Sequence, residues 1–333
     1  MTSNNNYTFS IIGAGQISAG YDSLSSKNIL THAHAIHSVK CTKLLGFYDK
    51  NFSKSLFASN KWNCKANKNI SDLISDSPDV LIVCVPDANH YEVLKKIVSL
   101  DYLPKLVICE KPLTDNFDLS KDIYLQYKNK GIPLWTNYQR RLDDNFKNIS
   151  FQFKSGNLGS FLTGSMIYAK GLKHNGSHGI DLVLNILGTP EKFLIAEKRY
   201  DFYQNDPTIS GCLLFKNSIF NLQAADENFY SIFEIDLLFQ NARFKFFNSA
   251  SKLTVQKPKK DPNFTKYVEL LEQETVNTEF LFCLKKLIIH SIDFLNGNIT
   301  ESICDSLSAI ETQRLCEKLS NTDINNFYNF EKI

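Results

Sequence analysis

The first 136 residues alternate short apolar runs with amphipathic segments, and this alternation constrains the fold more than any other feature of the sequence. The runs at 80–85 (VLIVCV) and 105–109 (KLVIC) are almost wholly apolar, as strands are when a parallel sheet is covered on both faces. Strands that alternate with helical patterns predict an α/β fold with a doubly wound parallel sheet. The predicted strands are 7–13, 43–49, 80–85, 105–109 and 133–136, and the predicted helices are 31–39, 52–60, 71–75, 88–100 and 116–130.

After about Arg141 the character of the sequence changes. Strand-like stretches there predict an open, mostly antiparallel sheet within an α+β domain. These strands are expected at 192–200, 210–215, 218–224, 233–239 and 242–247, and helices at 179–187, 279–295 and 302–319. A chain of 333 residues is long for one core. We therefore predict a first domain at 1–136 and a second at 137–333, and the last helix could pack back on the first domain.

The charge of the chain is nearly balanced, with 37 Lys and Arg against 35 Asp and Glu. A nucleic-acid or anionic-membrane partner normally requires a basic stripe, so neither is expected. The N-terminal octapeptide MTSNNNYT lacks the pattern of a signal peptide, and no apolar run is long enough to cross a bilayer. The 8 cysteines are scattered without a CxxC pair, which favours reduced thiols. We expect a cytoplasmic protein.

A glycine loop, GAGQIS, directly follows the first predicted strand. Gly13 permits a tight turn, and Gly15 lets the backbone approach a pyrophosphate. Gln16 and Ile17 would then open a helix whose N-terminus binds phosphate. Ser18 stands where a third glycine is usual, and an ordinary glycine turn is the alternative. In its βαβ context the loop predicts a dinucleotide-binding Rossmann domain.

An acidic residue at the end of the second strand usually binds the adenosine ribose of such a cofactor, about 20 residues beyond the glycines. Asp49 ends the second predicted strand but lies farther along the chain, and the polar stretch 18–28 accounts for the surplus as an insertion. Because a carboxylate repels a 2′-phosphate, we expect NAD in preference to NADP. Lys50 follows immediately and could soften that preference, so NADP stays open.

A second candidate segment, VPDANH at 85–90, ends the next buried strand. Ligands of open α/β sheets bind outside the carboxyl ends of the strands, so we predict that Pro86, Asn89 and His90 line the cofactor site. The alternative is a helix-capping turn, with Asp87 or Asn89 as the cap.

The tripeptide Glu110-Lys111-Pro112 ends the strand after that. A lysine in this position can orient a substrate hydroxyl or lower its pKa as hydride leaves. Pro112 stiffens the turn and disfavours a helical Lys111. We predict that Glu110 and Lys111 line the cofactor site and that Lys111 is catalytic, with an ordinary surface lysine as the alternative.

The segment HNGSHGID at 174–181 opens the predicted helix of the second domain. His178 and Asp181 are i and i+3 neighbours, and a carboxylate beside an imidazole suits general acid/base chemistry. A helix-capping histidine is one alternative. A metal site that adds His174 is another, although hydride transfer to nicotinamide needs no metal.

Three further histidines, His32, His34 and His37, alternate in a pattern that no single helical face collects. We expect them on a helix surface and not in a metal site. No bound metal is predicted for this chain.

Taken in order, these motifs resemble the Gfo/Idh/MocA oxidoreductase family, named from glucose–fructose oxidoreductase and inositol dehydrogenase. The EKP tripeptide followed by a GxHxxD-type helix is the more specific part of the resemblance. The matching segments are GAGQIS at Gly13, FYD ending at Asp49, VPDANH at Val85, EKP at Glu110, NYQRR at Asn137, SGNLGSF at Ser155, NGSHGIDL at Asn175, LGTPE at Leu187, and FLNGN and DSLSAIE near the end.

The resemblance implies a nicotinamide cofactor in the first domain and a sugar, cyclitol or related carbonyl compound between the domains. It implies that Lys111 contacts substrate, that His178 is the acid/base and that Asp181 is the later acidic residue of the same helix. Gln139, in NYQRR, is added to the cofactor site. The family often has an aspartate where this chain has His174, so His174 or Asn175 takes that role, or the role stays empty.

The combined reading is an NAD(P)-dependent oxidoreductase that moves hydride between a sugar-type alcohol and nicotinamide. A nucleotide-linked sugar of surface-polysaccharide biosynthesis is the expected substrate, and a homodimer or homotetramer is expected because many relatives pair through the open sheet. The alternatives are a non-enzymatic dinucleotide sensor or regulator, an imine or dihydrodiol reductase, and an enzyme that retains NAD while it oxidises and re-reduces its substrate.

Overall fold

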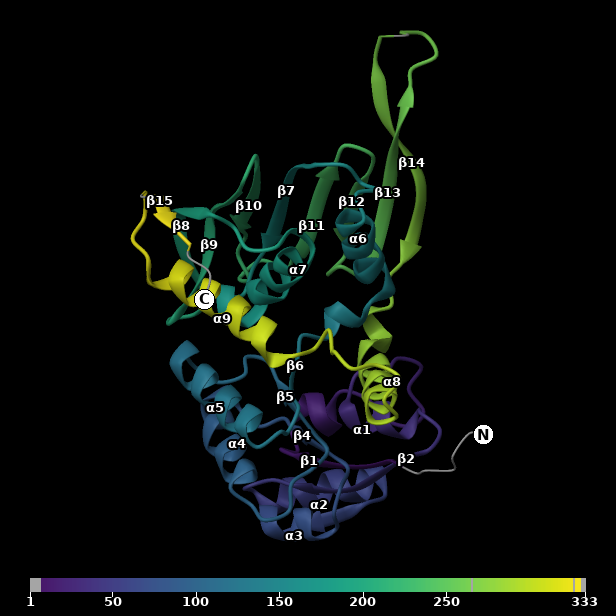
Figure 1. The fold of residues 1–333 in the computed structure, drawn as a ribbon, viewed down its shortest axis with the longest axis vertical. Coiled ribbons are helices and arrows are strands. Elements are labelled where there is room, and N and C mark those ends of the chain that lie inside the picture. The colour runs from purple at the N-terminus through teal and green to yellow at the C-terminus, as the bar shows by residue number, and fades with distance from the viewer. Residues whose placement is uncertain (1–6, 265, 326, 331–333) are drawn as a thin grey trace. The chain divides into compact units, whose positions relative to one another are not determined.

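The computed structural model describes residues 7–264, 266–325 and 327–330, and the chain divides into two compact units (Figure 1). The first unit comprises Met1–Leu142 and Leu281–Glu311, and the second comprises Asp143–Phe280 and Thr312–Ile333. The first unit therefore runs past the predicted boundary at residue 136 and includes a segment from near the C-terminus. Most of the N-terminal octapeptide used in the sequence analysis, residues 1–6, lies outside the described residues.

The first unit is built on a six-stranded sheet in the order β3-β2-β1-β4-β5-β6, with every strand pair parallel. The doubly wound sheet is confirmed, and β3 is the strand that the sequence did not predict. The strand order reverses between β1 and β4, which is where ligands bind in such sheets. The strands are β1 (Tyr7–Ile12), β2 (Thr42–Tyr48), β3 (Lys65–Asn67), β4 (Val80–Val83), β5 (Leu106–Glu110) and β6 (Leu134–Asn137).

Helices cover both faces of this sheet, and β4 shows why its sequence is continuously apolar. Val80 and Ile82 belong to the apolar cluster on one face, whereas Leu81 and Val83 belong to the cluster on the other. The first cluster takes in α1 (His32–His37), α2 (Phe52–Trp62) and α8 (Cys283–Leu295), and the second takes in α3 (Ile70–Ser75), α4 (His90–Val98) and α5 (Phe117–Asn129).

The segment 281–311 joins the first unit because α8 completes its core. Cys283, Leu284, Leu287 and Ile288 are all at most 2% exposed and pack in the same cluster as α1 and the sheet. These residues lie far from the rest of the unit in sequence, so local patterns do not reveal the association.

The second unit contains a nine-stranded sheet in the order β14-β13-β12-β11-β7-β10-β9-β8-β15. The β7–β10 pair is parallel and the other described pairs are antiparallel, which confirms the predicted mostly antiparallel sheet. The strands are β7 (Phe161–Tyr168), β8 (Lys192–Tyr203), β9 (Asp206–Phe215), β10 (Ser218–Ala224), β11 (Phe233–Phe239), β12 (Arg243–Phe247), β13 (Lys252–Lys260), β14 (Val268–Asn277) and β15 (Phe327–Asn329).

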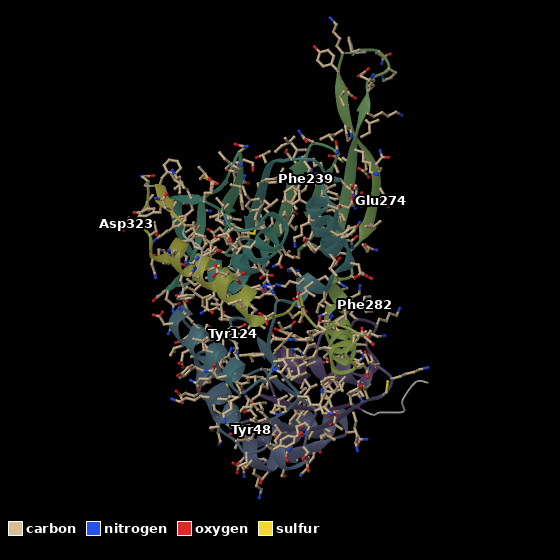
Figure 2. The ribbon with its side chains drawn as sticks, viewed as in Figure 1. Tyr48, Tyr124, Phe239, Glu274, Phe282 and Asp323 are labelled. Carbon is tan, nitrogen blue, oxygen red and sulfur yellow. The ribbon has the colours of Figure 1, made fainter. Side chains whose placement is uncertain are left out.

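Three helices, α6 (Asp144–Lys154), α7 (Ser177–Leu187) and α9 (Ser306–Asn321), contribute to the core of the second unit. Figure 2 contrasts the buried Phe239 on β11 with the exposed Glu274 on the edge strand β14. Sequence patterns missed α6, the central strand β7 and the β13–β14 hairpin. Within the described residues, no helix combines the length and the apolar character that crossing a membrane requires.

Candidate functional site

The glycine loop lies at the carboxyl end of β1, beside the end of β4. Gly13 has φ = +102°, and a Cβ atom there would lie 2.4 Å from the carbonyl oxygen of Cys84, so only glycine fits. A Cβ atom at Gly15 would meet no atom within 4 Å. The backbone at Gly15 therefore borders open space that a phosphate group can approach. Gln16 is exposed and Ile17 half-buried at the same edge.

A short π-helical turn, η1 (Gln16–Gly20), follows the loop where the sequence predicted the N-terminus of a helix. Ser18, which replaces the usual third glycine, is buried and donates a 3.0 Å hydrogen bond to the carbonyl of Gly15. The α-helix proper, α1, begins only at His32, because the insertion 18–28 separates it from the loop.

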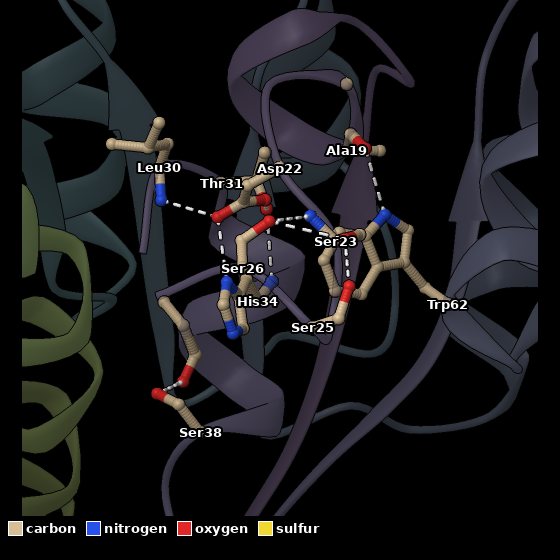
Figure 3. Close-up of polar contacts among 12 residues, drawn as sticks. Ala19, Asp22, Ser23, Ser25, Ser26, Leu30, Thr31, His34, Ser38 and Trp62 are labelled. Carbon is tan, nitrogen blue, oxygen red and sulfur yellow. Dashed lines mark hydrogen bonds and ion pairs between the residues drawn. The ribbon is translucent and has the colours of Figure 1, made fainter. Parts of the chain in front are cut away.

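Asp22 anchors the insertion to the start of α1 (Figure 3). Its carboxylate accepts hydrogen bonds from the Leu30 N–H at 2.6 Å and the Thr31 hydroxyl at 2.5 Å, and lies 2.8 Å from Nδ1 of His34. The His34 ring lies 5.9 Å from that of Trp62 on α2. The segment that follows the glycine loop is therefore tied to the start of α1 through Asp22, and α1 in turn contacts α2 through His34 and Trp62.

Asp49 lies within hydrogen-bonding distance of the glycine loop. Its Oδ2 accepts a 2.9 Å hydrogen bond from the Ala14 N–H, and its Oδ1 accepts one of 2.8 Å from the Asn51 N–H. Lys50 is exposed. The predicted ribose-binding carboxylate and the predicted phosphate loop are thus brought together.

His90 ties the end of β4 to the EKP turn. Its Nε2 lies 2.8 Å from the Val85 carbonyl oxygen and its Nδ1 lies 2.8 Å from that of Pro112. Its side chain is 1% exposed. Asn89 is half-buried and Pro86 exposed in the same turn.

Glu110, at the end of β5, is the centre of a buried polar network. Its Oε1 accepts a 2.7 Å hydrogen bond from the Asn137 amide and lies 2.7 Å from Nε2 of His32. Burial raises the pKa of the Glu110 carboxyl, but His32, Asn137 and the charge of Lys111 outweigh that effect and hold the pKa below its ordinary 4.5. Lys111 and Gln139, which lie close to Glu110 and Asn137 in the sequence, are half-buried.

The same network explains a cluster of potential metal ligands. The donor atoms of His32, Cys84 and Glu110 lie within 4.8 Å of one another, but the 2.7 Å separation of His32 and Glu110 is that of a hydrogen bond. Burial, followed by the charge of Glu110, raises the pKa of the Cys84 thiol, which disfavours the thiolate that a metal binds. The predicted surface location is wrong for His32 and His34, which are buried, whereas His37 is exposed.

The remaining predicted catalytic residues lie together in the second unit, on the turn η4 (Leu172–Gly176) and on α7. His174 is exposed and His178 is half-buried. Asp181 is completely buried, and its Oδ1 accepts a 2.9 Å hydrogen bond from the Thr312 hydroxyl on α9. Lys111 belongs to the first unit.

Two buried carboxylates from the β8–β9 hairpin hold this histidine segment. Asp206 accepts 2.8 Å hydrogen bonds from the Lys173 and His174 N–H groups, and Asp201 accepts one of 2.8 Å from the Lys170 N–H. The histidine segment is therefore held by carboxylates that lie 31–33 residues later in the sequence, after α7 and most of β8.

Several polar residues that hold the predicted site residues in place were not predictable from the sequence. Most of them contact residues at least 27 positions away in the sequence, so no local spacing indicates these contacts. Asp22 is the exception, because its partners lie 8–12 positions along the chain. One sequence signal was present for Asn137. Like Glu110, it is a polar residue at the end of a buried strand. The missed residues are Asp22, His32, Asn137, Asp201 and Asp206.

Comparisons with known proteins support an NAD-binding Rossmann fold in the first unit. Residues 7–138 match the model of the Gfo/Idh/MocA family, described as an oxidoreductase family with an NAD-binding Rossmann fold. The myo-inositol 2-dehydrogenase of Thermotoga maritima is 31% identical over 96 residues, which cover 28% of each chain. Across the curated relatives that it matches, the chain spans 28–40% of their length.

Solved structures share the fold over nearly the whole chain. An oxidoreductase from Agrobacterium radiobacter, solved with NAD+, L-tartaric acid and magnesium, superposes with a TM-score of 0.74 at 15% identity and covers 98% of each chain. The UDP-N-acetylglucosamine 3-dehydrogenase of Acidithiobacillus ferrooxidans gives 0.71 at 12% identity, covering 94% of this chain and 96% of that one. Residues 7–138 of this chain therefore form an NAD-binding Rossmann domain of the Gfo/Idh/MocA oxidoreductase type.

Proposed function

We propose that this protein is an NAD(H)-dependent oxidoreductase that interconverts an alcohol and a carbonyl on a sugar or sugar derivative. The observation that carries the proposal is the contact of Asp49 with the N–H of Ala14 in the glycine loop. That contact supports a dinucleotide site in which Asp49 would bind the adenosine ribose and the glycine loop would bind the phosphates.

The residues of the first unit fit a dinucleotide. Gly15 borders open space, and its neighbours can offer N–H groups to phosphate. The described residues provide no hydrogen-bond partner for the buried Nδ1 of His32 or Oδ1 of Asn137, so polar capacity remains near the end of β5. The predicted cofactor site comprises Gly13, Gly15, Gln16, Ile17, Asp49, Lys50, Pro86, Asn89, His90, Glu110, Lys111 and Gln139.

A bound nicotinamide would supply the hydride acceptor or donor. In the oxidation direction, with the hydride taken up by that nicotinamide, His178 would accept the hydroxyl proton of the substrate as its C=O bond forms. Lys111 orients and polarises that oxygen. Asp181 positions the helix that carries His178, and His174 is secondary.

The names of relatives support the substrate class. One sequence relative is a myo-inositol dehydrogenase and one structural neighbour acts on UDP-N-acetylglucosamine. We propose a cyclic polyol or sugar as substrate, a nucleotide-linked sugar of surface-polysaccharide biosynthesis as the specific case, and a cytoplasmic homodimer or homotetramer as the working form.

The test is titration of the full chain with NADH and NADPH, followed by nucleotide fluorescence. We expect saturable binding of NADH that is tighter than that of NADPH. Absence of binding of both cofactors at millimolar concentration would refute the proposed function.

A further inference from the structure

Three exposed rings adjoin one another beside the histidine segment of the second unit. The His174 ring lies 5.2 Å from that of Tyr203 and 6.5 Å from that of Phe202, between centroids, and the Phe202 and Tyr203 rings lie 4.5 Å apart at 86°. Phe202 is 50% exposed and Tyr203 is 39% exposed. Neither belongs to the apolar core of the unit. We call these three residues the ring cluster.

A bulge in β8 creates the ring cluster. Arg199 pairs with Thr208 and Tyr203 pairs with Asp206, so residues 200–202 lie opposite the single residue Pro207. Consecutive residues of a regular strand face opposite sides of a sheet, whereas the rings of residues 202 and 203 touch. Bulges re-aim side chains in this way and are frequent next to functional sites.

The ring cluster is fixed before any ligand arrives. Asp201, within the bulge, accepts hydrogen bonds from the Lys170 N–H at 2.8 Å and the Thr208 hydroxyl at 2.5 Å. Asp206, at the end of the bulge, holds the backbone of His174. Rings that are already ordered lose little further freedom when a ligand binds, and this preorganisation favours affinity.

Charged groups flank the rings. The Lys170 ammonium lies 4.6 Å from the centre of the Phe202 ring and 3.6 Å from Oε1 of Glu227. An apolar surface of a few rings bordered by charges is far smaller than a protein–protein interface. It matches a small cyclic molecule that has one C–H face and a rim of hydroxyls, because the C–H face packs on rings and the hydroxyls reach the charged groups.

We propose that Phe202 and Tyr203 form a stacking platform for the ring of a pyranose or cyclitol, and that this platform selects cyclic over open-chain polyols. The proposal rests on the proposed function and adds its specificity. His174 borders the platform, so its exposed ring serves substrate placement and not proton transfer.

The test measures binding of three probes to the full chain by isothermal titration calorimetry, with and without NADH. The probes are myo-inositol, UDP-N-acetylglucosamine and the open-chain L-tartrate. We expect Phe202→Ala to weaken binding of at least one cyclic probe about tenfold, the usual scale for removing an aromatic anchor. NADH affinity and any binding of L-tartrate should not change. Phe202→Tyr should restore the affinity.

Phe151→Ala is the matched control, because Phe151 is 69% exposed on α6 of the same unit and lies outside the ring cluster. It should leave all affinities unchanged. Three results would each overturn the proposed platform. They are unaltered binding of the cyclic probes in Phe202→Ala, an equal loss of L-tartrate binding in that variant, and no binding of either cyclic probe to the unaltered protein. Failure of the unaltered protein to bind NADH would instead refute the proposed function. A change of oligomeric state in Phe202→Ala with unchanged probe affinity would assign the rings to a subunit contact.

Discussion

At the residue scale, the contacts of single polar side chains decide what the first unit can bind. The Asp49 carboxylate accepts hydrogen bonds from two backbone N–H groups. These bonds hold it beside the glycine loop. The buried His90 ring lies within hydrogen-bonding distance of two carbonyl oxygens, those of Val85 and Pro112. The strand ends at the candidate cofactor site are thus fixed by side chains.

Replacing Asp49 by serine should shift cofactor preference toward NADPH. The substitution removes the charge that repels a 2′-phosphate, while the neighbouring Lys50 keeps its positive charge. Fluorescence titration should show weaker NADH binding and tighter NADPH binding than in the unaltered protein. An unchanged ratio of the two dissociation constants would mean that Asp49 does not contact the adenosine ribose.

Lys111→Ala and His178→Ala should each lower kcat by about 10²–10⁴-fold, the usual contribution of a positioned acid/base group. NAD affinity should change little in His178→Ala, because His178 lies outside the predicted cofactor site, whereas Lys111→Ala should also weaken NAD binding. His174→Asn should cost less. Steady-state kinetics with an active substrate measure these losses of kcat. A greater loss of kcat in His174→Asn than in His178→Ala would reverse the roles of the two histidines.

At the scale of elements, predictability followed the range of the interactions involved. β4 and β5 were predictable because burial on both faces makes their sequences almost continuously apolar. β7 was not, since Thr163, Gly164 and Ser165 interrupt its pattern although it pairs centrally with β10 and β11. α1 was predicted, but not its burial, because α8 covers it from a distant part of the chain. Apart from Asp22, the polar anchors of the candidate site are also non-local.

The β8–β9 hairpin should be sensitive to acid through Asp201. Burial raises the pKa of this carboxyl, but the hydrogen bonds from Lys170, Thr208 and Glu227 outweigh burial and hold the pKa below its ordinary 3.8. A carboxyl with a lowered folded-state pKa contributes stability that is complete above the unfolded-state value and is lost as pH falls through the folded-state value. We therefore expect this contribution at neutral pH and its loss below about pH 4.

Asp201→Asn should lower the free energy of unfolding of the second unit by about 1–3 kcal/mol at neutral pH, the scale of hydrogen bonds to a charged group. Thermal unfolding at pH 7 and pH 3 measures it, and the difference from the unaltered protein should shrink at pH 3. Asp323→Asn, at an exposed position of the same unit, is the control. A deficit in Asp201→Asn that is equal at both pH values would contradict the account.

At the scale of the whole molecule, the face of the nine-stranded sheet opposite the core helices is mixed in character. A hollow of about 430 Å³ there is lined by residues that include Ile167, Asp236, Lys245 and Glu272. If subunits associate through this face, polar groups contribute to the contact. Light scattering at micromolar concentration should show a dimer or tetramer, and Ile167→Asp should weaken it whereas Phe151→Asp on α6 should not. A monomeric unaltered protein would refute the proposed assembly.

The division of the first unit between Met1–Leu142 and Leu281–Glu311 has a consequence for protein synthesis. The sheet emerges from the ribosome before α8, and the residues of the second unit are made in between. At about 5–20 residues per second, the nascent sheet waits several seconds or more for Leu284, Leu287 and Ile288 to cover one of its faces. During that interval the apolar surface beside α1 is open to chaperones, and a ribosome stalled before residue 281 would carry a protease-sensitive first unit.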